Sequence, residues 1–232
     1  MDKIYIYLIV AGIILIMLIY LFTSNKRIVK LYNKYINQLN DKEVTGKQVA
    51  FFAKQKLNLT NLQFSLIDGK LTDCYVPQKR ILCLSEEVAE RPTIASVAIV
   101  AHEIGHAEQH QSKYFLFTLN NILSKITKIT SRFILPCLLF GIIALIFKWP
   151  TVHTGETLLI ASGILFLLAV VVKLTIIPVE LDASKRALKF LTHYEIITKK
   201  EVPKVKRLLS TAGRTYIVGL FQSINPFKNL KI

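Results

Sequence analysis

The fold that this sequence predicts is centred on the stretch Ile94-Ala95-Ser96-Val97-Ala98-Ile99-Val100-Ala101-His102-Glu103-Ile104-Gly105-His106. Between Thr93 and about Gln111, apolar residues recur with the spacing of one helical face, which indicates a single helix. Its apolar part, Ile94–Ala101, is only eight residues long and follows several charged residues. An apolar stretch this short is typical of a buried core helix and not of a membrane span. We therefore predict a domain outside the membrane, built around this helix.

Two histidines on this helix have the spacing that binds one metal ion. His102 and His106 are four residues apart, about 40° around the helix and about 6 Å along it, so both rings can reach a single ion. Glu103 lies beside the first histidine, where a carboxylate can take a proton from metal-bound water. The pattern predicts half of a catalytic zinc site, with two ligands and a catalytic acid/base. A third protein ligand has to come from elsewhere in the chain.

The chain is more hydrophobic than an ordinary water-soluble domain. Of its 232 residues, 52% are hydrophobic, and the mean hydropathy is +0.43. The apolar residues concentrate in three segments, Ile4–Phe22, Phe133–Phe147 and Leu158–Val179. The first is about 28 Å long as a helix, enough to cross a bilayer, and no small-residue cleavage site follows it, which favours an anchor over a signal peptide. We predict about three transmembrane helices.

The distribution of charge predicts the orientation in the membrane. Residues 23–132 contain 16 Lys/Arg and 9 Asp/Glu, and residues 180–232 contain 11 and 4. Positively charged loops stay in the cytoplasm, so we expect both segments there, with the N-terminus and the 148–157 link outside. The same distribution accounts for the net charge of +15 without nucleic acid, for which we find no recognition motif. The expected partners are the lipid bilayer and a protein or peptide substrate.

Several residues after the third span are candidates to complete the site. Glu180 is the first acidic residue there, and two membrane crossings return it to the side of the histidine helix. It fits the third ligand of a zincin, and an exposed juxtamembrane carboxylate fits the sequence equally well. His193 and Tyr216 are candidates to stabilise a tetrahedral oxyanion as hydrogen-bond donors.

A small β-sheet is expected before the histidine helix. Residues 62–67 and 71–75 flank Asp68-Gly69, a pair typical of a tight type I′ turn, which predicts a β-hairpin. A further turn at 76–79 precedes a third strand at 80–84. Upstream, Thr45 can cap a helix that runs from about Gly46 to Leu57.

Longer strings in this sequence are similar to those of a known family. They are Leu71-Thr72-Asp73, Pro77-Gln78-Lys79-Arg80, Leu84-Ser85-Glu86, the segment 98–107 and Pro178-Val179-Glu180-Leu181-Asp182-Ala183-Ser184. In these strings the chain resembles the YugP-type neutral zinc metallopeptidases, membrane proteins distantly similar to HtpX-like peptidases. The similarity extends over nearly the whole chain. The resemblance implies one catalytic Zn²⁺ ion, with His102, His106 and Glu180 as ligands and Glu103 as the catalytic acid/base.

The sequence departs from the pattern of its relatives at a few positions. Family members often have a histidine and an aspartate where this chain has Cys74 and Val76. HtpX-like enzymes have an aspartate four residues after the ligand glutamate, where this chain has Ser184. Asp182 is the nearest carboxylate. It either orients a ligand histidine or has an ordinary surface or capping role.

The expected fold is a mainly α membrane protein of the α+β kind, with a zincin-like helical catalytic domain, a small β-sheet and about three transmembrane helices. We expect an N-terminal anchor at 1–25, a cytosolic zincin domain at 26–132, a transmembrane hairpin at 133–179 and a cytosolic helical segment with the third ligand at 180–232.

The expected function is a membrane-anchored zinc-dependent metalloendopeptidase that hydrolyses peptide bonds in proteins at the cytosolic membrane face. The alternative is a catalytically inactive zinc-binding scaffold or partner-binding protein. The presence of Glu103 and a three-ligand set that leaves one position open disfavour it. An intramembrane peptidase is disfavoured by the charged residues just before the histidine helix.

Overall fold

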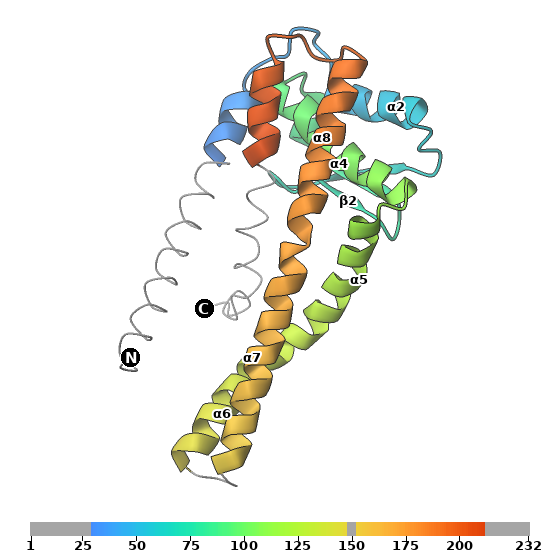
Figure 1. Cartoon of the computed structure of the whole chain (residues 1–232). Helices are drawn as coiled ribbons and strands as arrows, with labels where there is room; N and C mark the ends of the chain where they lie inside the picture. The colour runs from blue at the N-terminus through green and yellow to red at the C-terminus, as the bar shows by residue number, and fades with distance from the viewer. Residues whose placement is uncertain (1–28, 148–151, 212–232) are drawn as a thin grey trace. The chain divides into compact units, whose positions relative to one another are not determined.

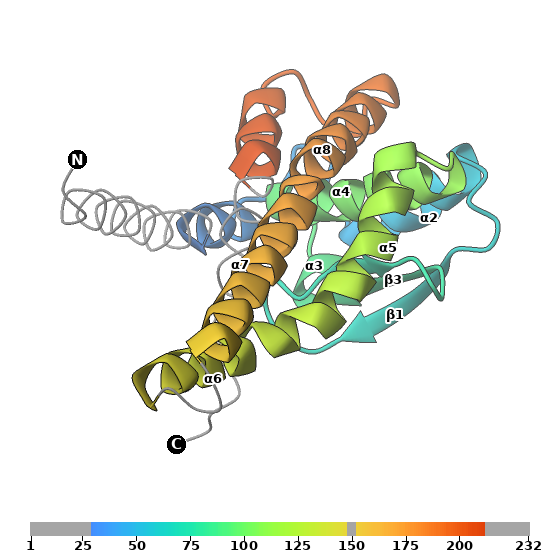
Figure 2. The same ribbon diagram turned by 60° about the horizontal axis from the view of Figure 1, so that its bottom comes forward.

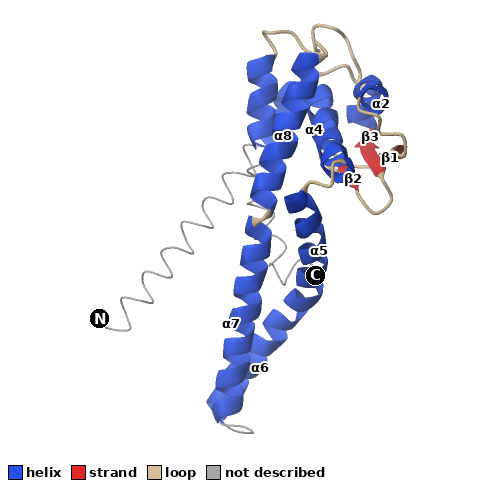
Figure 3. Cartoon of the chain, turned by 45° about the vertical axis from the view of Figure 1, so that its right-hand side comes forward, coloured by secondary structure: helices blue, strands red, loops and turns tan. Residues whose placement is uncertain are grey.

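The fold was obtained as a computed structural model, and the structure describes residues 29–147 and 152–211. The predicted N-terminal anchor and Tyr216 lie outside these residues. The described chain is mainly helical with a small three-stranded sheet, as predicted (Figures 1 and 3). The elements in chain order are α2 (Gly46–Lys56), β1 (Gln63–Ile67), β2 (Cys74–Val76), β3 (Ile81–Ser85), α3 (Glu86–Glu90), α4 (Ile94–Gln111), α5 (Phe115–Thr130), η1 (Ser131–Phe133), α6 (Ile134–Phe147), α7 (Val152–Leu174) and α8 (Ile176–His193), with further helices at residues 29–36 and 202–211.

The described residues form two compact units. The first unit contains the chain up to Ser112 and from Glu180 onward, with α2, the sheet, α3, α4 and most of α8. The second unit is Lys113–Val179, with α5, η1, α6 and α7. Because α8 begins at Ile176, its first turn belongs to the second unit and the rest of the helix to the first.

Helix α4 is the central element of the first unit. It begins where the sequence predicts, because the side chain of Thr93 accepts a hydrogen bond from the backbone N–H of Ser96 and so caps the helix. Fourteen of its 18 residues are buried, on all sides of the helix. It packs against α2, β2 and β3. A helix enclosed in this way is a core helix, which confirms the prediction of a buried helix.

The sheet has the strand order β1-β3-β2, with β3 parallel to β1 and antiparallel to β2. The predicted hairpin between the first two strands is therefore wrong, although Gly69 has the positive φ (106°) that a tight turn requires. Leu82 and Leu84 are both buried, so β3 takes the central place and separates β1 from β2. The hairpin instead joins β2 to β3, with Val76 opposite Ile81. Strand β2 becomes an edge strand that contacts α4.

In the second unit, α6 and α7 lie side by side and run in opposite directions (Figure 2). A Cβ atom added to Gly155 would lie 2.9 Å from the carbonyl oxygen of Gly141, so the two backbones are in close contact, as small residues allow between membrane helices. Two helical segments, Phe115–Phe147 and His153–His193, are long and apolar enough to cross a bilayer. Many of their large apolar side chains are exposed, among them Phe140, Phe147, Ile160 and Leu167.

Candidate metal centre

Three side chains that the sequence singles out meet in the first unit. His102 and His106 extend from α4, and Glu180, 78 residues after His102, extends from α8. The Nε2 atom of His102 is 2.9 Å from Oε2 of Glu180, and the Nε2 atom of His106 is 3.4 Å from Oε1. One potential ligand atom from each residue lies within 4.8 Å of the others. Since Glu180 is only 2% exposed, the interpretation as an exposed juxtamembrane carboxylate is wrong.

A glycine allows the two helices to come this close. A Cβ atom at Gly105 would lie 2.6 Å from the carbonyl oxygen of Ala183, and its other close neighbours are also backbone atoms of Ala183. Gly105 lies between the two histidines on α4, and Ala183 is three residues after Glu180 on α8. Any larger residue at 105 would force the backbones apart and move Glu180 away from the histidines.

The second nitrogen of each histidine has a polar neighbour of its own. Nδ1 of His102 is 3.3 Å from the Ser184 hydroxyl, which also lies within hydrogen-bonding distance of the Leu209 carbonyl oxygen. Nδ1 of His106 is 3.0 Å from Oε1 of Gln109. When Nδ1–H donates to such an acceptor, Nε2 carries the lone pair that can bind a metal. Both Nε2 atoms face Glu180, so the three ligand atoms point toward one common point.

The charge of Glu180 dominates the protonation of His106. Burial favours the neutral imidazole, but the hydrogen bond and the negative charge of Glu180 outweigh it and raise the pKa of His106 to about 9. A proton is therefore held between His106 and Glu180 at neutral pH. A divalent cation would compete with this proton for the same nitrogen and oxygen atoms.

Glu103 is also buried, next to the three convergent residues and outside that group. Its Oε2 atom accepts a hydrogen bond, 2.8 Å long, from the backbone N–H of Tyr75 in β2. Burial raises the pKa of Glu103, and the neighbouring histidines lower it by less. A raised pKa makes a carboxylate a stronger proton acceptor, which is the property that a catalytic acid/base needs.

The remaining predicted residues lie elsewhere. His193 is exposed at the end of α8, about 20 Å along the helix axis from Glu180, and the structure does not bring it to the other residues. Asp182 contacts Gln109 and Arg186 and does not reach the three convergent atoms. Tyr216 lies outside the described residues. His110 lies against the hydroxyl of Tyr75, at 2.7 Å.

The donor set fits a zinc ion. Two imidazole nitrogens and one carboxylate oxygen are a set of protein ligands that catalytic zinc sites use, with a fourth position left for water or substrate. Within the described part of the chain, these three residues are the group of potential ligands close enough to share an ion. Sequence reasoning missed Tyr75 and Gln109 as neighbours of the site, and it noted Ser184 only as a departure from HtpX-like enzymes. A backbone N–H leaves no signal in the sequence, and Gln and Ser are common residues on any helix.

Comparison with known proteins gives an independent description of the chain. The model of a family described as "Putative neutral zinc metallopeptidase" matches residues 7–230. The "Putative membrane protease YugP" of Bacillus subtilis (strain 168) is 32% identical over 184 residues, which cover 78% of this chain and 77% of that protein. No solved structure matches the chain.

Proposed function

This chain belongs to the family described as putative neutral zinc metallopeptidases, and from this we propose that it is a membrane-anchored zinc endopeptidase that cleaves proteins at the cytosolic membrane face. The proposal rests on one observation: His102, His106 and Glu180 are buried with their potential ligand atoms close together, and Glu103 lies beside them. Peptidase membership implies a protein or peptide substrate.

In the proposed mechanism, His102, His106 and Glu180 hold the metal through two nitrogens and one oxygen. When bound, zinc polarises the scissile carbonyl and lowers the pKa of the attacking water. Glu103 takes up the proton of that water and then delivers it to the leaving amine. The backbone N–H of Tyr75 holds one carboxylate oxygen of Glu103, so the other oxygen is the one that carries the proton. Peptide cleavage thus needs all four side chains.

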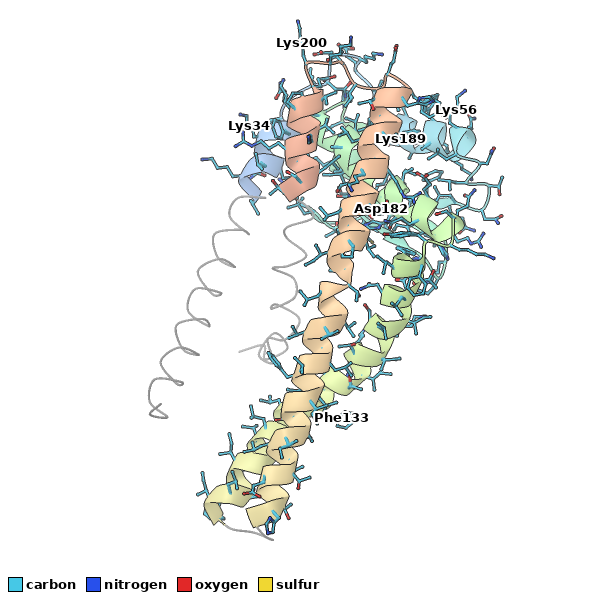
Figure 4. The ribbon with its side chains drawn as sticks, in the orientation of Figure 1. Lys34, Lys56, Phe133, Asp182, Lys189 and Lys200 are labelled. Carbon is cyan, nitrogen blue, oxygen red and sulfur yellow. The ribbon has the colours of Figure 1, made fainter. Side chains whose placement is uncertain are left out.

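The proposed membrane arrangement is supported by the second unit. Its helices α6 and α7 expose large apolar side chains, and the relative from Bacillus subtilis has the words "membrane protease" in its name. We assign residues 133–147 and 158–179 as two crossings, with residues 4–22 as an anchor. The basic segments 26–132 and 180–232 then lie in the cytosol, because positive loops are retained there. Figure 4 labels lysines on the helices and loops of both segments, Lys34, Lys56, Lys189 and Lys200.

The test compares metal content with cleavage in the full chain, purified in detergent. Glu103→Gln removes the acid/base but none of the three proposed ligands. We expect it to retain one zinc per chain by elemental analysis and to lose cleavage of an unfolded protein substrate by at least about a thousandfold. Glu90→Gln, at an exposed position before α4, is the matched control and should cleave like the parent chain.

Each other outcome has a definite meaning. A parent chain without stoichiometric metal, or cleavage that survives a chelator, would contradict the proposal. Bound zinc with no cleavage that depends on Glu103 would support the alternative, an inactive zinc-binding scaffold.

A further inference from the structure

A chain of hydrogen bonds ends on His106, on the side of the ring away from Glu180. Nδ1 of His106 is 3.0 Å from Oε1 of Gln109, and Nε2 of Gln109 donates to Oδ2 of Asp182 at 2.9 Å. Gln109 is completely buried, and Asp182 is half-buried on α8, where Figure 4 labels it. The two helices that supply the metal ligands thus also supply this second connection between them.

The direction of these hydrogen bonds follows from Asp182, the last residue of the hydrogen-bonded series. A carboxylate can only accept, and Asp182 also accepts from Nε of Arg186 at 2.6 Å. Arg186 in turn donates through Nη1 to Glu108 at 2.9 Å. Because Asp182 accepts, Gln109 has to turn its NH₂ group toward Asp182 and its carbonyl oxygen toward His106. His106 then has to donate from Nδ1.

His102 has no equivalent arrangement. Its Nδ1 neighbour is the hydroxyl of Ser184, at 3.3 Å. The hydroxyl donates to the Leu209 carbonyl oxygen at 3.4 Å, so its own oxygen can accept from Nδ1 of His102, but through a neutral group and at a longer distance than in the series on His106. Of the two histidines, His106 is the one whose tautomer is determined by an ion pair.

We propose that Asp182, acting through Gln109, is a positioning residue that orients the His106 ring and keeps its Nε2 available as a metal ligand. This inference rests on the proposed function, because it takes Nε2 of His106 to be a zinc ligand. Ser184, at the position where HtpX-like enzymes have an aspartate, lies beside His102. The carboxylate of this chain lies two residues earlier, at Asp182, and reaches His106 through the Gln109 amide.

The expected effect can be measured as zinc affinity, without reference to cleavage. Loss of a partner that orients a ligand histidine lowers metal affinity by about 10–100-fold. Gln109→Met keeps the length of the side chain and removes both of its hydrogen bonds, so we expect about this loss. Gln111→Met, at an exposed position two residues later on α4, is the matched control and should leave the affinity unchanged. The measurement is competition with a fluorescent zinc chelator, on the full chain in detergent.

A second pair of variants tests Asp182, which is half-buried. Asp182→Asn keeps an oxygen that can accept from Gln109 and should bind zinc nearly as tightly as the parent chain. Asp182→Leu keeps the branching at Cγ and has no acceptor, so the Gln109 amide is free to turn over. We expect zinc binding to weaken by about tenfold.

The two proposals fail in different ways. A parent chain that binds no zinc overturns the proposed function. A parent chain that binds zinc, with folded Gln109→Met and Asp182→Leu variants that bind it equally well, overturns only the positioning role. If Gln109→Met does not fold, the comparison of Asp182→Asn with Asp182→Leu decides, since a mere packing role predicts the same zinc affinity for both.

Discussion

The two units of this chain distribute polar and apolar side chains in opposite ways. The first unit buries His102, Glu103, His106 and Glu180 inside an apolar core. The second exposes apolar side chains along most of α6 and α7. Helix α4 carries the polar site and is almost fully enclosed, whereas α7 is far more apolar in sequence and more exposed. Burial in this molecule therefore does not follow hydrophobicity.

The free-energy cost of burying ionisable groups and of exposing apolar groups explains what each unit needs. A buried ionisable group is expensive unless it is hydrogen-bonded or binds a metal, and each of the four polar residues of the site has such a partner. Exposed apolar surface is costly in water and favourable in lipid. The proposed function gives the first unit a metal and the second a bilayer, and the following predictions test each proposal.

The largest effect is expected at the metal centre. Glu180→Ala removes one of the three proposed ligands and leaves two buried histidines without their acidic partner. Zinc affinity should fall by more than the 10–100-fold that loss of an orienting partner costs. Glu156→Ala, at an exposed acidic residue of the second unit, should change nothing. Equal zinc affinity in both variants, by competition with a chelator, would remove the basis for the metal site.

The next prediction tests whether α7 of the second unit faces lipid while β1 of the first unit faces water. Leu167 in α7 is 63% exposed and Leu66 in β1 is 61% exposed, so they differ little in exposure. A lysine near the centre of a membrane helix costs about 2.5–3.5 kcal/mol of insertion free energy, whereas a lysine on a water-exposed surface costs little. Leu167→Lys should therefore reduce the fraction of protein recovered in membranes, and Leu66→Lys should not. Equal recovery would show that α7 does not face lipid.

A somewhat smaller effect is expected at two glycines. Gly105→Ala places a methyl group 2.6 Å from the Ala183 carbonyl oxygen, and nothing lies within 4 Å of a Cβ atom at Gly163 in α7. We expect Gly105→Ala to lower the free energy of unfolding by about 1–3 kcal/mol and to weaken zinc binding. Gly163→Ala should be neutral or slightly stabilising, since alanine favours a helix. Thermal unfolding in detergent and zinc titration measure both. A tolerated Gly105→Ala would show that the approach of α4 to α8 is not tight.

The smallest effect, counted per pH unit, is a dependence on pH. The pKa of His106 is raised from 6.5 to about 9, so the metal-free chain gains stability from this proton below about pH 6.5 and loses it as the pH rises through 9. Zinc competes with the same proton, so its affinity should rise over that range, by up to about tenfold per pH unit. Thermal unfolding of the metal-free chain and zinc titration from pH 6.5 to 9 should give opposite slopes. Two parallel slopes would contradict a shared proton.

Local structure was largely predictable from the sequence. Thr45 caps α2 through a capping box with Gln48, and Thr93 caps α4, because both use contacts between residues three apart. The hairpin around Asp68-Gly69 was predicted from equally local signals and is wrong. A turn sequence indicates where the chain can bend, but β1 and β2 are both bound to β3, whose apolar residues take the centre of the sheet.

By itself, the sequence determined the helix that carries His102, Glu103 and His106, because helical periodicity places residues four apart on one face. It also determined the apolar segments, because their length and composition are local properties. It left open whether Glu180 is exposed or lies with the two histidines, and it did not indicate Tyr75 or Gln109 as neighbours of the site. Only the tertiary structure decided these points, since they depend on the contact of Gly105 with the backbone of α8 and on β2 lying against α4. Such contacts join residues far apart in the chain and arise from packing, which no local pattern records.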